Sequence, residues 1–146
     1  MSDNIFNMEN RVKPNERFLS LAKDALQDLL VSTNGLDGVL LASTDGFEVV
    51  SLFQQNYDGG KLSAVGSSIL ALVQALVTEA HLIGCRSVIL DAENGKIMIS
   101  AVPNANQPMI VILLTKQQVL LGQLMHGLNK TVKQLVELDA QYNTKA

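Results

Sequence analysis

Few residues of this chain have the type and spacing that catalysis or metal binding requires. His81 and His126 fall on different predicted helices, and Cys85 is the only cysteine among the 146 residues. A zinc site needs about four convergent ligands, which these three residues do not provide. Ser67 and Ser68 lie within a predicted helix, where serine hydroxyls usually bond back to the backbone, and no serine stands in a G-x-S-x-G turn. The sequence therefore predicts no catalytic residues, no metal ligands and no cofactor.

Gly60-Lys61 resembles the end of a phosphate-binding P-loop, but the rest of the motif is missing. Gln55 stands where the first glycine is needed, and Leu62 stands where a Ser or Thr should hold magnesium. Asp24 and Asp28 share one exposed face of a predicted helix, which does not suit a catalytic pair of acids. We therefore do not expect the chain to hydrolyse nucleotides, or to be an enzyme.

The composition predicts a single folded domain with apolar surface to spare. The chain is 47% hydrophobic and 17% charged, whereas roughly a quarter of the residues of an average soluble domain are charged. So few charges leave apolar patches exposed, and such patches mark sites of association. The formal net charge is -3 and the Lys and Arg residues are scattered, so we expect no nucleic-acid partner.

Nothing in the chain is typical of a secreted or membrane-inserted protein. The start of the sequence is polar and lacks the basic and apolar regions of a signal peptide. A single cysteine excludes an internal disulfide and suits a reducing compartment. The longest uncharged stretch, Leu62–Thr78, is short and rich in Ser, Gly and Gln, which argues against a bilayer span. The expected location is cytoplasmic.

Hydrophobic periodicity and turn residues predict the order α-β-β-α-β-β-β-α. This is an α/β (α+β) domain with a five-stranded, mostly antiparallel sheet and helices on both faces. The first helix starts at Pro14-Asn15 and stops at Asn34-Gly35, and a capping box at Thr115–Gln118 opens the last helix, which ends near Leu138. The remaining elements are Val39–Ser43, Phe47–Phe53, the helix Lys61–Ile83 closed by Gly84, Arg86–Asp91, Lys96–Val102 and Met109–Leu114. Residues 1–14 are predicted to be a disordered tail, 15–139 the domain, and 140–146 a loose tail.

The central helix divides into three sectors at 100° per residue. A broad face of large aliphatic residues is predicted to pack on the sheet: Leu62, Val65, Ile69, Leu72, Val73, Leu76 and Ile83. A stripe of small residues suits close helix–helix contact, with plain solvent exposure as the alternative: Ala64, Ser68, Ala71, Ala75 and Thr78. The absence of charge between Lys61 and Glu79 favours the contact. The third sector fits a looser partner or simple exposure equally well: Leu70, Gln74, Val77 and His81.

The segment Leu36–Phe47, with its Asp-Gly turn, resembles the first hairpin of the dynein light-chain roadblock family. Ser87–Asp91 and Gly95–Ile99 resemble the middle strands of that family, and Pro108–Leu114 resembles its last strand. Members include the bacterial gliding regulator MglB and scaffold subunits that hold small GTPases. The resemblance covers roughly Glu16–Leu138 and implies a roadblock/profilin-like fold.

The same resemblance implies a non-catalytic homodimer that binds a small Ras-like GTPase. Carried over from the family, the dimer interface comprises the small-residue stripe and part of the third strand: Ala64, Ser68, Ala71, Ala75, Thr78, Val88, Ile89 and Leu90. The GTPase would dock on the third sector: Leu70, Gln74, Val77 and His81. The family shares no catalytic residues, and its activating members act by ordering the GTPase's own site.

Two other functions stay open at this point. One is a structural scaffold or polarity module that has no GTPase partner, which predicts the same dimer. The other is a small-ligand sensor that uses the space between sheet and helices. The sequence shows no convergent polar groups for such a pocket, so this function is the weakest of the three.

Overall fold

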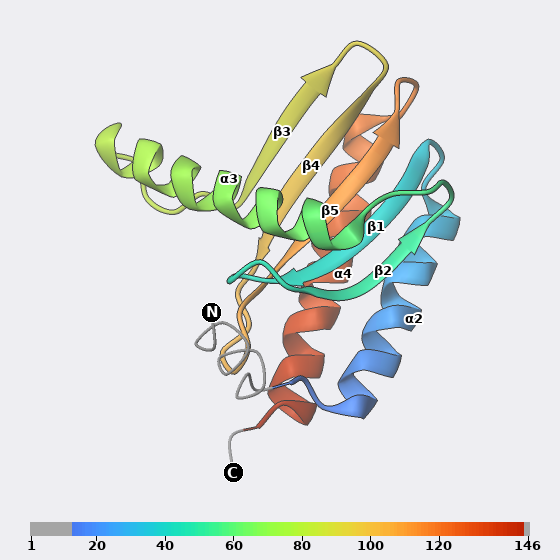
Figure 1. Cartoon of the computed structure of the whole chain (residues 1–146), viewed down its shortest axis with the longest axis vertical. Helices are drawn as coiled ribbons and strands as arrows, with labels where there is room; N and C mark the ends of the chain where they lie inside the picture. The colour runs from blue at the N-terminus through green and yellow to red at the C-terminus, as the bar shows by residue number, and fades with distance from the viewer. Residues whose placement is uncertain (1–12, 145–146) are drawn as a thin grey trace, which may run out of the picture.

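An antiparallel sheet with helices on both faces forms the fold of this computed structural model, which describes residues 13–144 (Figure 1). The order of elements is the predicted one, and the predicted fold class is confirmed. The elements are α2 (Glu16–Ser32), β1 (Leu36–Ser43), β2 (Glu48–Phe53), α3 (Gly59–Glu79), β3 (Ser87–Ala92), β4 (Gly95–Val102), β5 (Met109–Lys116) and α4 (Leu121–Tyr142). Most of the predicted N-terminal tail, residues 1–12, lies outside the described part of the chain.

The strands are arranged in the order β2-β1-β5-β4-β3, and every neighbouring pair is antiparallel. The first and last hairpins therefore meet where β1 pairs with β5, which makes these two strands the centre of the sheet. Both read as almost continuous apolar runs, because helices cover both of their faces. β3 lies at one edge of the sheet and β2 at the other.

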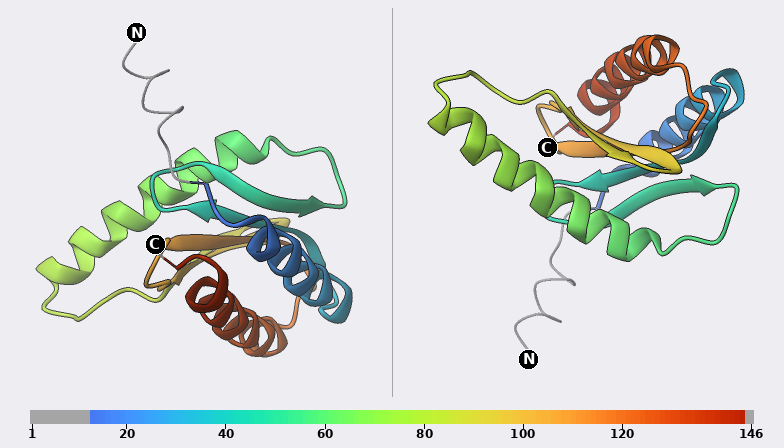
Figure 2. Two further views of the ribbon diagram at one scale, coloured as in Figure 1. Left: turned by 90° about the horizontal axis from the view of Figure 1, so that it is seen from below. Right: turned by 90° about the horizontal axis from the view of Figure 1, so that it is seen from above.

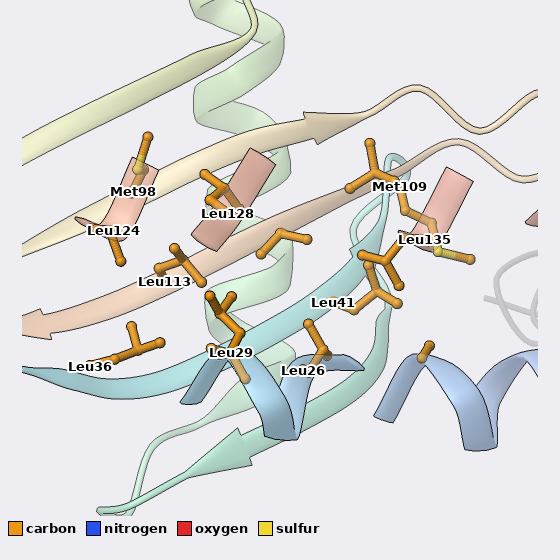
Figure 3. Packing of buried hydrophobic residues seen from close by; sticks show 14 of the residues in the cluster. Leu26, Leu29, Leu36, Leu41, Met98, Met109, Leu113, Leu124, Leu128 and Leu135 are labelled. Carbon is orange, nitrogen blue, oxygen red and sulfur yellow. The ribbon is translucent and has the colours of Figure 1, made fainter. Parts of the chain in front are cut away.

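Helices α2 and α4 lie side by side on one face of the sheet, and α3 lies alone on the other (Figure 2). The larger core is between the sheet and the helix pair. In Figure 3, Leu26 and Leu29 of α2 and Leu128 and Leu135 of α4 point at Leu41 and the strands beside it. A smaller core beneath α3 contains Leu40, Ile99, Ile110, Ile112 and Leu70.

The start of α4 differs from the prediction. Thr115 does not cap the helix, because it lies in β5, where its hydroxyl accepts a hydrogen bond from the Lys96 backbone N–H at 3.0 Å. The helix begins at Leu121, and its N-cap residue Leu120 makes no side-chain cap bond. Pairing with β4 extends the strand into the predicted capping box, as far as Lys116. By contrast, the predicted cap of α2 is confirmed, since the Asn15 side chain accepts from the Arg17 N–H at 2.8 Å.

The end of α4 is also longer and better anchored than predicted. The helix continues to Tyr142, so the expected loose tail from residue 140 is wrong up to that point. Asp139 is fully buried, and its carboxylate accepts bonds from the backbone N–H groups of Asn106 (2.9 Å) and Gln107 (3.1 Å) and from Asn143 Nδ2 (3.0 Å). This carboxylate fixes the β4–β5 loop to the end of the helix.

Candidate interaction surface

Helix α3 crosses the open face of the sheet, and its C-terminal half extends past the edge strand β3 (Figures 1 and 2). Asp58 caps its first turn by accepting from the Lys61 N–H at 3.0 Å. Since the second half of the helix has little sheet beneath it, much of its surface has no intramolecular partner. This helix is the most distinctive feature of the molecule.

The side of α3 that faces the sheet is made of small residues, contrary to the prediction. Its buried residues are Gly59, Ser63, Gly66 and Leu70. A Cβ on Gly66 would come within 2.4 Å of Ile112 Cδ1, so this glycine lets the helix lie close to the strands. The Ser63 hydroxyl needs no partner from the sheet, because it donates to the Gly59 carbonyl at 2.7 Å.

Most of the large residues predicted to form the core face of α3 are exposed instead. Leu72 is 72% exposed, Leu76 is 68% exposed and Ile83, beyond the helix, is 99% exposed. Val65 is exposed as well, whereas Leu62, Ile69 and Val73 are partly buried. The helix is therefore rotated from the predicted orientation, and its largest side chains face outward.

The predicted small-residue stripe lies on the same exposed side of the helix. Ala64, Ser68, Ala71, Ala75 and Thr78 are all exposed. The hydroxyls of Ser68 and Thr78 bond back to carbonyls of their own helix at 3.0 Å, as expected of helical serine and threonine. Together with Leu72 and Leu76, the stripe forms a wide uncharged surface between Lys61 and Glu79.

By length and composition alone, α3 could cross a membrane. Its most apolar 18-residue window has a mean hydropathy of 1.5, and only 17% of that window is buried inside the molecule. The objection from length in the sequence analysis therefore does not hold. The physical objection is the packing of Ser63, Gly66 and Leu70 against the sheet, which a bilayer-spanning helix would have to give up.

The third sector of α3 does not act as one surface. Leu70 is buried beneath the helix, so its prediction as a partner-binding residue is wrong. Gln74 is held by two hydrogen bonds to the backbone of Cys85, one from its Nε2 to the carbonyl oxygen and one from the Cys85 N–H to its Oε1, both 3.1 Å. Val77 is partly buried and His81 is exposed. Gln74 thus fixes the chain that leads into β3.

His81 ends α3 in a backbone conformation that normally selects glycine. Its φ is 61°, and the Leu82 N–H donates to the Val77 carbonyl at 2.9 Å while the His81 N–H donates to that of Thr78 at 3.0 Å. These two bonds define a Schellman motif. The helix therefore stops at His81, three residues before the predicted stop at Gly84.

Replacing His81 with glycine is expected to raise the free energy of unfolding by about 1 kcal/mol, since a left-handed conformation costs other residues about that much. Urea unfolding followed by circular dichroism measures the difference. The same change at His126, an exposed position inside α4, is expected to lower the stability by about 0.5 kcal/mol. Equal effects at the two positions would contradict this reading of His81.

The edge strand β3 is the second exposed feature next to α3. It pairs with β4 on one side, and its other side has no strand partner within residues 13–144. Ile89 and Leu90 are exposed and Val88 is partly buried. A bare edge with apolar side chains is a template for pairing with another chain.

Residues 13–144 show no arrangement typical of catalysis. No three His, Cys, Asp or Glu side chains within that range gather to hold a metal ion. The one perturbed group there is Tyr57, whose hydroxyl donates to the buried Asp37 carboxylate. This hydrogen bond, with burial and the negative charge of Asp37, raises the pKa of Tyr57. The pair ties the loop before α3 to the start of β1.

The chain has an α/β fold with an exposed apolar helix, and comparisons with solved structures agree with this fold. MglB of Myxococcus xanthus superimposes with a TM-score of 0.81 at 15% identity, over 93% of this chain and 99% of that one. A structure described as MglB with a tetrameric arrangement gives 0.77 at 16% identity, over 89% and 98%. Profilin II of Acanthamoeba castellanii is more distant, at 0.50 and 15% identity over 79% and 96%. At these identities the likeness concerns the fold.

The family assignment comes from the sequence. The model of the Roadblock/LC7 domain matches residues 22–113, and the chain belongs to this family. A search of curated proteins finds no match. Roadblock/LC7 domains are in general non-catalytic regulators and adaptors, which agrees with the exposed, uncharged helix and the lack of a catalytic cluster in the described residues.

Proposed function

We propose that this chain is a cytoplasmic, homodimeric adaptor that binds a small Ras-like GTPase through α3 and is not itself an enzyme. One observation supports it most directly: two large aliphatic side chains of α3, Leu72 and Leu76, face solvent beside a row of small residues. An apolar surface of this kind is typical of a protein interface.

In the proposed dimer, the β3 strands of two chains pair with each other through Val88, Ile89 and Leu90. This pairing would remove the bare edge of the sheet. The half of α3 that extends past β3 in the single chain (Figure 1) would then lie over the partner's sheet. In this arrangement it would lie beside the partner's α3. The helix contact would comprise the small-residue stripe, with Leu72 and Leu76 added to it.

The GTPase would dock on the flank of α3 that faces the β4–β5 loop. Gln74, Val77 and His81 are the residues of the third sector that this proposal retains, whereas the buried Leu70 is excluded. Ala71 borders the same flank and is exposed. Dimerisation and GTPase binding therefore use adjoining parts of one helix.

The proposed binding of a GTPase is tested by affinity capture from native cytoplasm with this chain as bait. The capture is done once with a non-hydrolysable GTP analogue and once with GDP. The wild-type chain is expected to recover a small P-loop GTPase, at least tenfold more with one nucleotide than with the other. Val77→Arg, on the docking flank and outside the small-residue stripe, is expected to abolish the recovery. Asp24→Arg, on an exposed part of α2 across the sheet, serves as the control and should leave it unchanged.

Recovery of the same proteins by wild type and Val77→Arg would reject the docking flank. Recovery of no nucleotide-binding protein would favour the scaffold or polarity module, which needs the dimer alone. A third function, binding of a small polar ligand, has little support, because the described polar groups next to α3 already bond to the protein, as Gln74 and Ser67 do.

A further inference from the structure

An apolar groove of about 260 Å³ lies between α3 and the β4–β5 loop. Leu70, Ala71 and Gln74 of the helix form one wall, and Pro103 and Pro108 of the loop form the other. Residues of β4 and β5 lie between these walls. Ala71 and both prolines are exposed, so the groove is open to solvent along its length.

The groove suits an apolar occupant. Two of its three polar side chains are already engaged, since Gln74 bonds to the backbone of Cys85 and Ser67 donates to the Ala64 carbonyl at 3.0 Å, and the third is Thr44. No charged residue lines it. Burial of apolar surface is therefore the main free energy that an occupant would gain.

The described chain begins beside this groove. The Lys13 carbonyl accepts a hydrogen bond from Gln107 Nε2 at 3.5 Å, and Gln107 directly precedes Pro108 in the groove wall. The loop is fixed at this point by the bonds from the Asn106 and Gln107 backbone to Asp139. Residues 1–12 therefore join the domain at the mouth of the groove.

The apolar side chains of those twelve residues include Ile5, Phe6 and Met8. Phe6 is seven residues before Lys13, and seven extended residues span up to about 23 Å. The distance to be covered is shorter, because Lys13 bonds to Gln107 and the Cα atoms of Gln107 and Pro108 in the groove wall are about 3.8 Å apart. The segment is long enough to enter the groove from the position of Lys13. It also supplies the apolar side chains that the groove requires.

We propose that residues 1–12 fold back and place Ile5 and Phe6 in this groove of their own chain. Taken alone the segment is predicted to be disordered, and the folded domain provides the surface that orders it. Docked there, it covers Ala71 and Gln74. If the proposed function holds, the docked segment and the GTPase therefore use the same flank of the helix.

Disulfide trapping tests the docking with the purified full chain alone, so its failure is distinct from that of the GTPase proposal. In a Cys85→Ser background, Asn7→Cys is combined with Ala71→Cys in the groove wall. We expect a disulfide within one chain, identified by peptide mass spectrometry. With Ser20→Cys on exposed α2 in place of Ala71→Cys, we expect at least tenfold slower formation.

The anchor is tested in the Asn7→Cys, Ala71→Cys chain. Adding Phe6→Asp is expected to slow disulfide formation at least tenfold, whereas Ser2→Asp, with the same added charge, should leave the rate unchanged. Circular dichroism checks that both variants fold. Equal rates with Ala71→Cys and Ser20→Cys, or no effect of Phe6→Asp, would overturn the proposal. Disulfides found only between chains would also overturn it, since the occupant would then be a second copy.

Discussion

Asp139→Ala is expected to lower the free energy of unfolding by at least about 3 kcal/mol, among the largest effects of any single change in this domain. The carboxylate accepts three hydrogen bonds while it is fully buried. Hydrogen bonds to a charged group contribute about 1.5–3 kcal/mol each. The substitution would leave the Asn106 and Gln107 N–H groups without their acceptor and free the β4–β5 loop from α4.

Urea unfolding measures this effect, and Glu137→Ala provides a matched control. Glu137 is an exposed acidic residue of the same helix, and its substitution should stay within about 0.5 kcal/mol of wild type. Asp139→Asn keeps the shape and one oxygen, so an intermediate loss is expected. A loss below 1 kcal/mol for Asp139→Ala would show that the loop is held by other contacts.

The importance of Asp139 could not be read from the sequence, and the reason is physical. Its partners are 32 and 33 residues away in the chain, so no local period or cap motif reports them. The prediction at Thr115 is wrong for a related reason. The local sequence fits a capping box, but Thr115 belongs to β5 because this strand pairs with β4. Local sequence patterns therefore predict the helices and strands well, but they misplace the ends of those elements where contacts between distant residues determine them.

The order of elements was predictable because its signals are local. Continuous apolar runs mark β1 and β5, and Gly46, at φ 96°, makes the first hairpin turn that Asp-Gly indicates. Asn15 caps α2 through its own side chain. The edge position of β3 followed from the family resemblance, and the sheet order confirms it.

The orientation of α3 was not predictable by the same means. A helix that is apolar on most sides has no polar face to mark its exposed side. Hydrophobic periodicity places the largest residues in the core, but close packing of the helix on the sheet selects small residues such as Gly66 and Ser63. The signal that could have found this face is the spacing of Gly59, Ser63, Gly66 and Leu70, which recur every three or four residues.

This reversed orientation leads to the second large expected effect. Leu72→Glu is expected to convert the proposed dimer into monomers and to raise its dissociation constant at least 100-fold, equivalent to about 2.7 kcal/mol. A charge at the centre of an apolar interface loses its hydration without gaining a partner. Because Leu72 is 72% exposed in the single chain, the substitution should leave the fold itself intact.

Val31→Glu is the matched control, since Val31 is 73% exposed near the end of α2, on the other side of the sheet. Light scattering at several concentrations should give twice the chain mass for wild type and Val31→Glu, and the single-chain mass for Leu72→Glu. Circular dichroism should be the same for all three. A wild-type chain that remains monomeric at about 100 µM would reject the dimer. A dimeric Leu72→Glu would instead show that the β3 edges, and not the outward leucines of α3, hold the two chains together.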